Sequence, residues 1–340
     1  MAGVIERHWY APRPWLAVLL WPLSALFALV SGLRRLAYRL GLLRQARLAC
    51  PVVVVGNINV GGVGKTPLTL SLIESLQALG LRVGVISRGY GGSRREPGLV
   101  RAGDTASEVG DEPLLFAQSG VPVATGRDRV AAGALLLAAH PGLDLILSDD
   151  GLQHYRLARD LELVVLDGTR GLGNGCLLPA GPLRERASRL SRVGALVVNG
   201  EATGPLPEVA GVPRFTMALE AGEFFEVGKP GNRRQAADFS GERVVALAGI
   251  GHPERFFSTL ASLGLRCDAT LAFPDHHAFT AADLPQADAL VVTTKDAVKL
   301  YGINHARLWA LPVRARLSPD LARWIAAQLK LRDANGRKIS

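Results

Sequence analysis

The chain has 340 residues and is 48% hydrophobic, which is enough to build two packed domains of ordinary size. Its net charge of +9 favours an anionic partner, such as nucleic acid, an acidic membrane surface or a phosphorylated substrate. The three cysteines, Cys50, Cys176 and Cys267, are widely spaced and form no C-x-x-C pair, which argues against a disulfide framework and a zinc site.

The first predicted element is an apolar segment near the N-terminus. Residues 15–30 read WLAVLLWPLSALFALV and carry no charge. With residues 31–33 they approach the roughly 20 residues of a membrane-spanning helix. Pro22 would kink such a helix, and Trp9, Tyr10 and Trp15 are placed to lie at the membrane interface. The pattern predicts an N-terminal membrane helix that spans the bilayer or enters one leaflet.

The apolar segment could also be a cleaved signal peptide or a core helix of a soluble domain. The basic residues that follow it argue against the signal peptide. They are Arg34, Arg35, Arg39, Arg44 and Arg47. A cleaved signal peptide has its main positive charge before the apolar core, and a core helix of a soluble domain rarely has so long an uncharged run. The positive-inside rule predicts that the chain after residue 33 is cytoplasmic. Leucines between the arginines predict a basic amphipathic helix that lies on anionic lipid.

A glycine-rich loop comes next, between a predicted buried strand at 52–55 and a helix that should end at Gly80. It matches the second half of the phosphate-binding pattern G-x-x-x-x-G-K-[ST], but Asn59 occupies the place of the first glycine. Asparagine adopts the left-handed backbone conformation more readily than most residues, so the match is weakened but kept. The predicted ATP-binding residues are Asn59, Val60, Gly61, Gly62, Val63, Gly64, Lys65 and Thr66.

An acidic pair, Asp149 and Asp150, follows a predicted strand at 143–147. In P-loop enzymes an acid at this position holds Mg²⁺ directly or through water, and the threonine of the loop, here Thr66, can ligate the same ion. Adjacent aspartates after a buried strand are also costly without a cation nearby. The sequence therefore predicts a site for ATP and Mg²⁺.

Further strands alternate with helices along the rest of the chain. They are predicted at 81–87, 161–167, 194–200, 243–249 and 288–294. This alternation predicts an α/β fold with a P-loop NTPase-like, mostly parallel sheet covered by helices on both faces. A segment rich in proline and glycine, residues 201–213, is the candidate boundary to a smaller C-terminal α/β domain.

Two classes of function fit these motifs: a kinase of a small molecule or lipid, and a membrane-associated P-loop ATPase switch that acts on protein partners. The switch class has a lysine before the paired glycines of its loop, where this chain has Val60, which argues against a switch. A kinase needs a group that accepts the proton of the attacked hydroxyl. Asp111 and Glu112 in EVGDEP, and His276 or His277 in FPDHHAF, could form a carboxylate–imidazole pair across two domains.

Arginines beside glycines form a third group of candidates. They occur in SRGYGG (87–92), GRDR (126–129) and LPAGPLRER (178–186), where they could bind phosphate or sugar oxygens of an anionic substrate. Arg88 and Arg184 are the best placed, at predicted strand ends. We expect no nucleic-acid partner, because the aromatic content is only 6% and no stacking residues are interleaved with the basic ones.

Taken together, the motifs resemble those of the tetraacyldisaccharide 4′-kinase family. In order along residues 56–299 they are GNINVGGVGKTP, SRGYGG, VGDEP, DDGLQH, LPAGPLRE, GIGHPERFF, FPDHH and TTKDAVK. The resemblance implies ATP-dependent phosphorylation of the 4′-hydroxyl of an acylated glucosamine disaccharide 1-phosphate, giving lipid IVA in lipid A biosynthesis. It also implies inner-membrane lipid as a partner, with the catalytic domains on the cytoplasmic side. The family loop likewise lacks the first glycine.

The resemblance also implies roles for individual residues. The catalytic acid falls on Asp111, paired with His276 or, as a fallback, His277, and Lys65 completes the catalytic set. The other implied assignments are Thr66, Glu112, Asp149 and Asp150 for the metal, and Arg88, Gln153 and Arg184 for the substrate. Leu152 and Thr294 depart from the family pattern, which has phenylalanine and glutamate there. The expected parts are a membrane helix with its basic flank (1–48), a P-loop kinase domain (49–205) and a C-terminal domain that closes the cleft (206–340).

Overall fold

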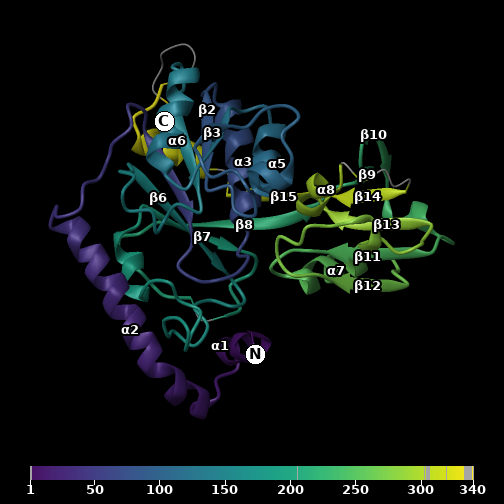
Figure 1. Cartoon of the computed structure of the whole chain (residues 1–340), viewed down its shortest axis with the longest axis horizontal. Coiled ribbons are helices and arrows are strands. Elements are labelled where there is room, and N and C mark those ends of the chain that lie inside the picture. Colours follow the sequence, from purple (N-terminus) through teal and green to yellow (C-terminus); the bar gives the residue numbers. More distant parts are fainter. Residues whose placement is uncertain are drawn as a thin grey trace.

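The computed structural model describes residues 2–204, 206–301, 303, 307–318, 320–332 and 339. Within these residues the chain forms two α/β domains, which we call the large and the small domain, and a long N-terminal helix (Figure 1). The described helices are α1 (Ala2–Tyr10), α2 (Pro14–Arg39), α3 (Lys65–Ala78), α4 (Ala106–Val109), α5 (Asp111–Gln118), α6 (Arg129–Ala139), α7 (Pro253–Ser262), α8 (Thr294–Leu300) and α9 (Leu321–Gln328), with the 3₁₀ turns η1 (Ala187–Arg192), η2 (Ala236–Phe239) and η3 (Ala281–Asp283).

The large domain is built on a sheet whose described strands run in the order β15-β8-β7-β6-β1-β5-β2-β4-β3. Their bounds are β1 (Val52–Gly56), β2 (Val83–Ser87), β3 (Gly98–Leu99), β4 (Val123–Thr125), β5 (Leu145–Asp149), β6 (Leu161–Asp167), β7 (Ala195–Asn199), β8 (Arg214–Ala221) and β15 (Val313–Leu317). The sheet is parallel except at its two edges, where β3 and β15 are antiparallel to their neighbours. The predicted mostly parallel sheet is confirmed.

Strand β1 shows why this sheet is covered on both faces. Its four valines are at most 1% exposed, so neither face of the strand meets water. Val53 and Val55 pack in the core formed with α3, α5 and α9, while Val52 and Val54 pack in the core formed with α6 and η1. The β-branched run therefore becomes a central strand with helices on each side.

The small domain has a second sheet, whose described strands run in the order β10-β9-β14-β13-β11-β12. Their bounds are β9 (Phe224–Glu226), β10 (Lys229–Arg234), β11 (Val244–Ala248), β12 (Ala269–Ala272), β13 (Ala289–Thr293) and β14 (Leu308–Leu311). The last four strands are parallel to one another, and β9 and β10 add an antiparallel edge. Helix α7 packs on one face of this sheet and α8 on the other.

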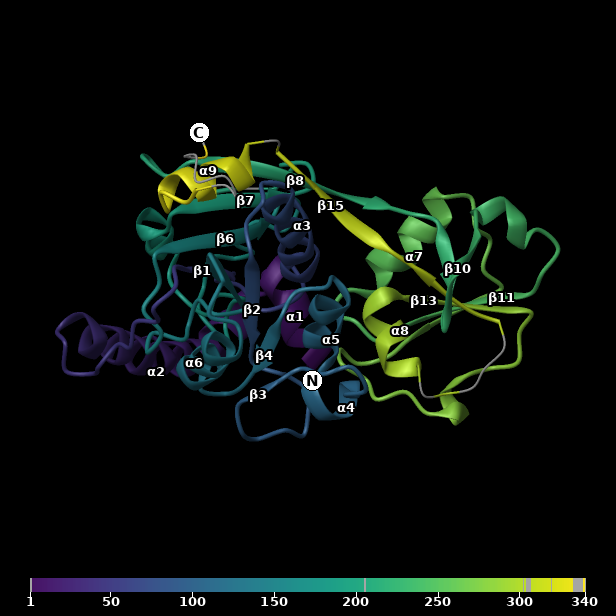
Figure 2. The ribbon, with the colours of Figure 1, turned by 90° about the horizontal axis from the view of Figure 1, so that it is seen from above.

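The predicted domain boundary between residues 205 and 206 needs correction. Strand β8 comes after that boundary, yet it pairs with β7 in the large sheet. The chain enters the small domain after β8 and returns through β15, which pairs with β8, before α9 packs beside α3 (Figure 2). The described residues of the proline-rich segment 201–213 therefore lie between two paired strands of the large domain.

Helix α2 is long and apolar enough to cross a membrane, with a mean hydropathy of 2.1 over its most apolar 18 residues and 11% of that window buried. A narrow stripe packs on the large domain through Leu16 and Leu20, which contact Ala180. Most of the other large apolar side chains are exposed: Trp15, Val18, Leu19, Trp21, Leu23, Leu26, Leu29, Val30, Leu33 and Leu36. The helix lies on the opposite side of the large domain from the small domain (Figures 1 and 2).

One expectation for this region was wrong, and a second is confirmed for part of its length. Trp9 is only 8% exposed, and its indole N–H donates to Pro179 O at 2.9 Å, so it does not lie at an interface. The predicted basic amphipathic helix is confirmed as far as Arg39, where it forms the last part of α2. Arg44 and Arg47 follow in the connection to β1.

Candidate active site

The phosphate-binding loop connects β1 to α3, which begins at Lys65. Gly61 (φ +106°) and Gly64 (φ +95°) have a left-handed backbone, which other residues adopt only at a cost. A Cβ at Gly61 would meet open space, whereas one at Gly64 would lie 2.6 Å from Nδ2 of Asn199, which donates to Val63 O. The loop is thus held by Asn199 at Gly64 and is open to solvent at Gly61, as a site for phosphate groups requires.

Asn59 has a structural function in this loop. Its backbone is not in the left-handed region, contrary to the expectation, and the residue is 3% exposed. Its Nδ2 donates to Gly171 O at 2.9 Å, and the neighbouring Val60 N donates to Pro182 O at 2.8 Å. The asparagine thus ties the start of the loop to the segment after β6, which is a role that a glycine could not fill.

Lys65 points at the acidic end of β5. Its Nζ donates to Asn57 Oδ1 at 3.2 Å and lies 3.4 Å from Oδ1 of Asp150, whose other oxygen lies 3.4 Å from Arg184 Nη1. Burial raises the pKa of Asp150, but the charges of Lys65, Arg184 and Arg129 outweigh that effect and hold the pKa below its ordinary value. Asp150 is therefore an ionised carboxylate that orients two cations.

Asp149, one residue earlier, has the opposite environment. It is 1% exposed, and its Oδ1 accepts a bond from Thr69 at 3.4 Å, while Oδ2 has no hydrogen-bond partner among the described residues. Burial and the nearby charges of Glu112 and Asp150 raise its pKa well above the ordinary value. A buried carboxylate with a free oxygen beside two other acids is a position that a cation would stabilise.

Glu112 adjoins this position from the start of α5. Its Oε1 accepts bonds from Thr66 Oγ1 at 3.0 Å and from Lys295 Nζ at 3.3 Å. The structure therefore brings all four predicted metal residues to one edge of the large sheet: Thr66, Glu112, Asp149 and Asp150. Among the described residues no three acidic, histidine or cysteine side chains form a complete metal site by themselves.

Asp111 and His276 meet across the two domains. Asp111 begins α5 in the large domain and is 3% exposed, and His276 follows β12 in the small domain. His276 Nδ1 lies 2.9 Å from Oδ2 and 3.1 Å from Oδ1 of Asp111. His277 instead has its Nε2 3.3 Å from Oδ2 of Asp283 and its ring stacked on Phe273. Of the two histidines, the structure thus pairs His276 with the carboxylate.

Two lysines that sequence reasoning missed complete this pair. Lys295 Nζ lies 3.4 Å from His276 Nε2 and 4.0 Å from Oδ2 of Asp111, and Lys299 Nζ lies 3.9 Å from the same oxygen. Burial raises the pKa of Asp111, but the hydrogen bond from His276 and the charges of the two lysines leave it below the ordinary value. The lysines are four residues apart on α8, a spacing that places both on one face and could have signalled a joint role.

Arg129 is a further residue whose function the sequence did not reveal. The predicted phosphate-binding role of GRDR is wrong for this residue, because it is only 4% exposed. Its Nη2 donates to the backbone oxygens of Asp149 at 2.9 Å and Asp150 at 3.0 Å, and Asp128 caps α6. Arg129 thereby fixes the backbone of the acidic strand end.

Of the three predicted substrate residues, Gln153 and Arg184 lie beside the same loop. Gln153 Nε2 donates to Asn57 O at 3.1 Å and to Glu185 Oε1 at 2.9 Å. Arg184 N donates to Ile58 O, which places this residue beside the phosphate-binding loop. Arg88 follows β2, is exposed, and has no acidic partner in the described part of the chain.

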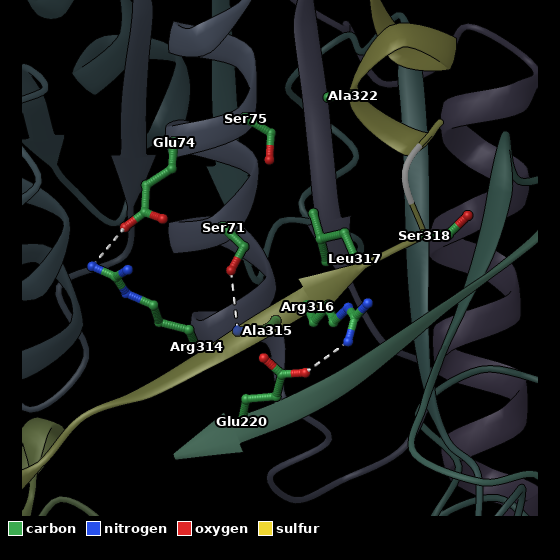
Figure 3. A pocket seen from close by; sticks show the side chains of 10 residues that line it. All are labelled: Ser71, Glu74, Ser75, Glu220, Arg314, Ala315, Arg316, Leu317, Ser318 and Ala322. Carbon is green, nitrogen blue, oxygen red and sulfur yellow. Dashed lines mark hydrogen bonds and ion pairs between the residues drawn. The ribbon is translucent and has the colours of Figure 1, made fainter. Parts of the chain in front are cut away.

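A separate cavity of about 290 Å³ lies between α3 and β15 (Figure 3). Glu74 lies 3.9 Å from Arg314, and Glu220 lies 3.4 Å from Arg316, so its charged side chains satisfy one another. None of the predicted site residues lines it. The candidate active site is therefore the edge of the large sheet at the phosphate-binding loop, together with the adjoining small domain.

This arrangement defines a class of protein. A glycine-rich loop joins a buried parallel strand to a helix, its lysine lies beside an acid at the end of the neighbouring strand, and a carboxylate–histidine pair adjoins them. These are the parts of a P-loop nucleotide-binding enzyme with a candidate base for transfer to a hydroxyl group.

Comparison with known proteins makes the assignment specific. The sequence model of the family described as tetraacyldisaccharide-1-P 4′-kinase (LpxK) matches residues 16–330. Proteins called tetraacyldisaccharide 4′-kinase are 60% identical in Chromobacterium violaceum, over 96% of this chain and 98% of theirs, and 46% identical in Neisseria gonorrhoeae, over 96% of each. The crystal structure of LpxK from Aquifex aeolicus in complex with ATP is 30% identical, with a TM-score of 0.80 over 92% of this chain and 99% of that one. The chain belongs to the tetraacyldisaccharide 4′-kinase family, an ATP-dependent kinase family, which confirms the resemblance found in the sequence.

Two substitutions one residue apart should change stability in opposite directions. Because the pKa of Asp149 is raised in the folded protein, its ionised form costs stability at neutral pH, and this cost disappears as the pH falls and the group is protonated. Without nucleotide, Asp149→Asn should therefore raise Tm at pH 7.5 by roughly 2–4 °C, the shift that about 1 kcal/mol produces in a domain of this size. The gain should shrink at pH 5.

Asp150→Asn is the matched control and should lower Tm at pH 7.5. Its pKa is depressed, so the ionised carboxylate contributes stability above the ordinary value of 3.8, and this contribution is lost only as the pH falls through the depressed pKa. Thermal unfolding followed by circular dichroism measures both variants. A destabilised Asp149→Asn protein would contradict the charge assignment.

Proposed function

We propose that the protein transfers the γ-phosphoryl group of ATP to the 4′-hydroxyl of a tetraacyldisaccharide 1-phosphate, giving lipid IVA on the cytoplasmic side of the bacterial inner membrane. Family membership supports the reaction, and the complex of the Aquifex aeolicus relative with ATP supports the donor. The observation that carries the proposal is the Asp111–His276 pair, 2.9 Å apart, beside the phosphate-binding loop.

In this proposal Asp111 accepts the proton of the sugar hydroxyl. Its pKa lies below the ordinary value, so the carboxylate is ionised at neutral pH and able to take a proton. The sugar oxygen forms a bond to the γ-phosphorus as the bond to the β-phosphate oxygen breaks, and ADP leaves. His276 orients Asp111 through Nδ1, and Lys65 with the loop amides neutralises the charge on the phosphoryl oxygens.

The acidic residues fit a Mg²⁺ ion. Asp149 offers a buried carboxylate oxygen without a partner in the described structure, and Thr66 and Glu112 offer oxygens beside it. Mg²⁺ is typically bound by one or two carboxylates, with phosphate and water oxygens as the other ligands, so an incomplete protein site is what a magnesium nucleotide needs. When bound, the ion supplies charge neutralisation to the phosphates. Asp150, paired with Lys65 and Arg184, would orient these cations.

Arg88, Gln153 and Arg184 would bind the phosphate and sugar oxygens of the substrate, and two of them, Gln153 and Arg184, contact the residues that lead into the loop. Its acyl chains would stay in the inner leaflet, because moving them into water costs about 0.8 kcal/mol per CH₂. The exposed apolar face of α2 supports this placement, since it can embed the enzyme in the same leaflet.

A transfer assay with labelled ATP tests the proposed reaction. Label should be transferred from ATP to the tetraacylated disaccharide. Without the disaccharide, ATP should be hydrolysed slowly. Rapid hydrolysis without lipid phosphorylation would instead support the membrane-associated ATPase switch.

The two neighbouring histidines offer a matched test of the catalytic pair. His276→Gln should lower kcat for transfer by roughly 10²-fold, at the lower end of the range for a misplaced general base, with little change in KM. His277→Gln should retain near-normal kcat, because this residue contacts Asp283 and Phe273. Both variants should bind ATP as the wild type does. A larger loss of kcat in His277→Gln than in His276→Gln would show that His276 is not the partner of Asp111.

The exposed face of α2 can be changed without touching its packed stripe. Replacing Leu23, Leu26 and Val30 by serine removes three exposed apolar side chains, each at least 55% exposed, and leaves Leu16 and Leu20 in place. Recovery of the protein with membranes after cell lysis should fall markedly, while ATP binding by the solubilised protein is unchanged. Full membrane recovery of the triple variant would contradict the proposed anchor.

A further inference from the structure

A pocket of about 240 Å³ lies at the carboxyl end of α2, and we call it the basic pocket. Arginines from three segments line it: Arg35 and Arg39 from α2, Arg159 from the connection before β6, and Arg189 and Arg192 from η1. Tyr155 also lines it, and Glu162 is the one acid among the lining residues. The pocket therefore presents a concentration of positive charge where an apolar helix ends.

Three of the five arginines are held in ion pairs that build the walls. Glu162 lies 3.0 Å from Arg159 and 2.5 Å from Arg189, both largely buried. Arg35 lies 3.4 Å from Glu185, which is outside the pocket lining. These ion pairs hold the pocket walls in place. The other two lining arginines take no part in them.

Arg39 and Arg192 are those two. Both are exposed, and neither has an acidic partner within the described residues. A guanidinium group has a planar fork of donors that matches the oxygens of a phosphate, and two of them on one cavity can bind the same group. The free donors of the pocket thus fit a phosphate.

Glu185 separates the basic pocket from the candidate active site. Its side chain is 2% exposed and accepts bonds from Tyr155 Oη at 2.5 Å and from Arg35 on the pocket side. Gln153, which also contacts Asn57 before the phosphate-binding loop, donates to the same carboxylate at 2.9 Å. A buried carboxylate in this place repels an anion that approaches from the loop, so a ligand enters from the side of α2.

Exposed leucines neighbour the pocket arginines of α2 along the chain. Leu36, Leu40, Leu42 and Leu43 follow the exposed face of α2 past its end and are 42–74% exposed. Arginines at the end of an apolar helix lie at the depth of lipid headgroups, and basic pockets on the cytoplasmic side bind anionic headgroups. The phosphate that reaches such a pocket most readily is one carried by a membrane lipid.

We propose that the basic pocket binds the phosphate of an anionic phospholipid of the surrounding membrane, with Arg39 and Arg192 as the binding residues. The proposal rests on the membrane placement of α2 given above and is independent of the phosphoryl-transfer reaction. A bound phospholipid would link the end of α2 to η1, because residues of both line the pocket. This phospholipid is a different molecule from the disaccharide substrate.

Native mass spectrometry of the full chain in nonionic detergent tests the site, with phosphatidylglycerol as the titrant and phosphatidylcholine as the headgroup control. The wild type should bind one phosphatidylglycerol in preference to phosphatidylcholine. Arg39→Ala/Arg192→Ala should weaken that binding at least about tenfold, as expected for the loss of two charge-assisted contacts. Arg13→Ala/Arg44→Ala removes equal charge from residues that flank α2 outside the pocket, and should bind as the wild type does.

Three results would overturn the proposal. Unchanged binding by the pocket variant would remove the site, and an equal loss in both double variants would assign binding to general positive charge. The third uses the transfer assay in phospholipid-free micelles, where the pocket variant should keep its kcat and its KM for the disaccharide. A raised KM would show that the pocket holds the substrate's own 1-phosphate. Because binding is read without turnover, failure of the kinase proposal leaves the first two results interpretable.

Discussion

The carboxylate of Asp111 is buried, and burial alone would favour its protonated form. The small domain supplies what reverses this: the hydrogen bond of His276 and the charges of Lys295 and Lys299. Asp111 itself belongs to α5 of the large domain. Groups of the small domain therefore hold the pKa of the candidate base below its ordinary value despite burial, and the contact between α5 and α8 is as much a part of the site as the phosphate-binding loop.

Asp149 and Asp150 lie in different electrostatic environments, and we infer their roles from that difference. Asp150 has two cations from the protein, Lys65 and Arg184, whereas Asp149 keeps an oxygen without a partner among the described residues. Their pKa values are consequently pushed apart, one below and one well above the ordinary value. Neighbouring groups separated in this way commonly have different functions. Here one carboxylate organises the protein's own cations, and the other is left for an ion that comes with the nucleotide.

Local patterns in the sequence predicted what is local in the structure. The valine run of β1, the glycines before Lys65 and the acids at the end of β5 each specify their own conformation or burial, and all were predicted. Which sheet a strand joins depends on distant residues, so the return of β8 and β15 to the large domain was missed. The role of the buried Arg129 was missed for the same reason. Its partners are backbone oxygens, which no sequence motif indicates. The substitution at Asn59 looked like a weakened motif, but its amide anchors the loop to Gly171.

The most direct test of the account is the pH dependence of kcat/KM for transfer in the wild type and in Lys295→Met. If the small domain keeps Asp111 ionised, removing this positive charge raises the pKa of the carboxyl group, and the acid limb of the profile moves to higher pH. An acid limb at the same pH in both proteins would show that the charge of the base does not depend on the second domain.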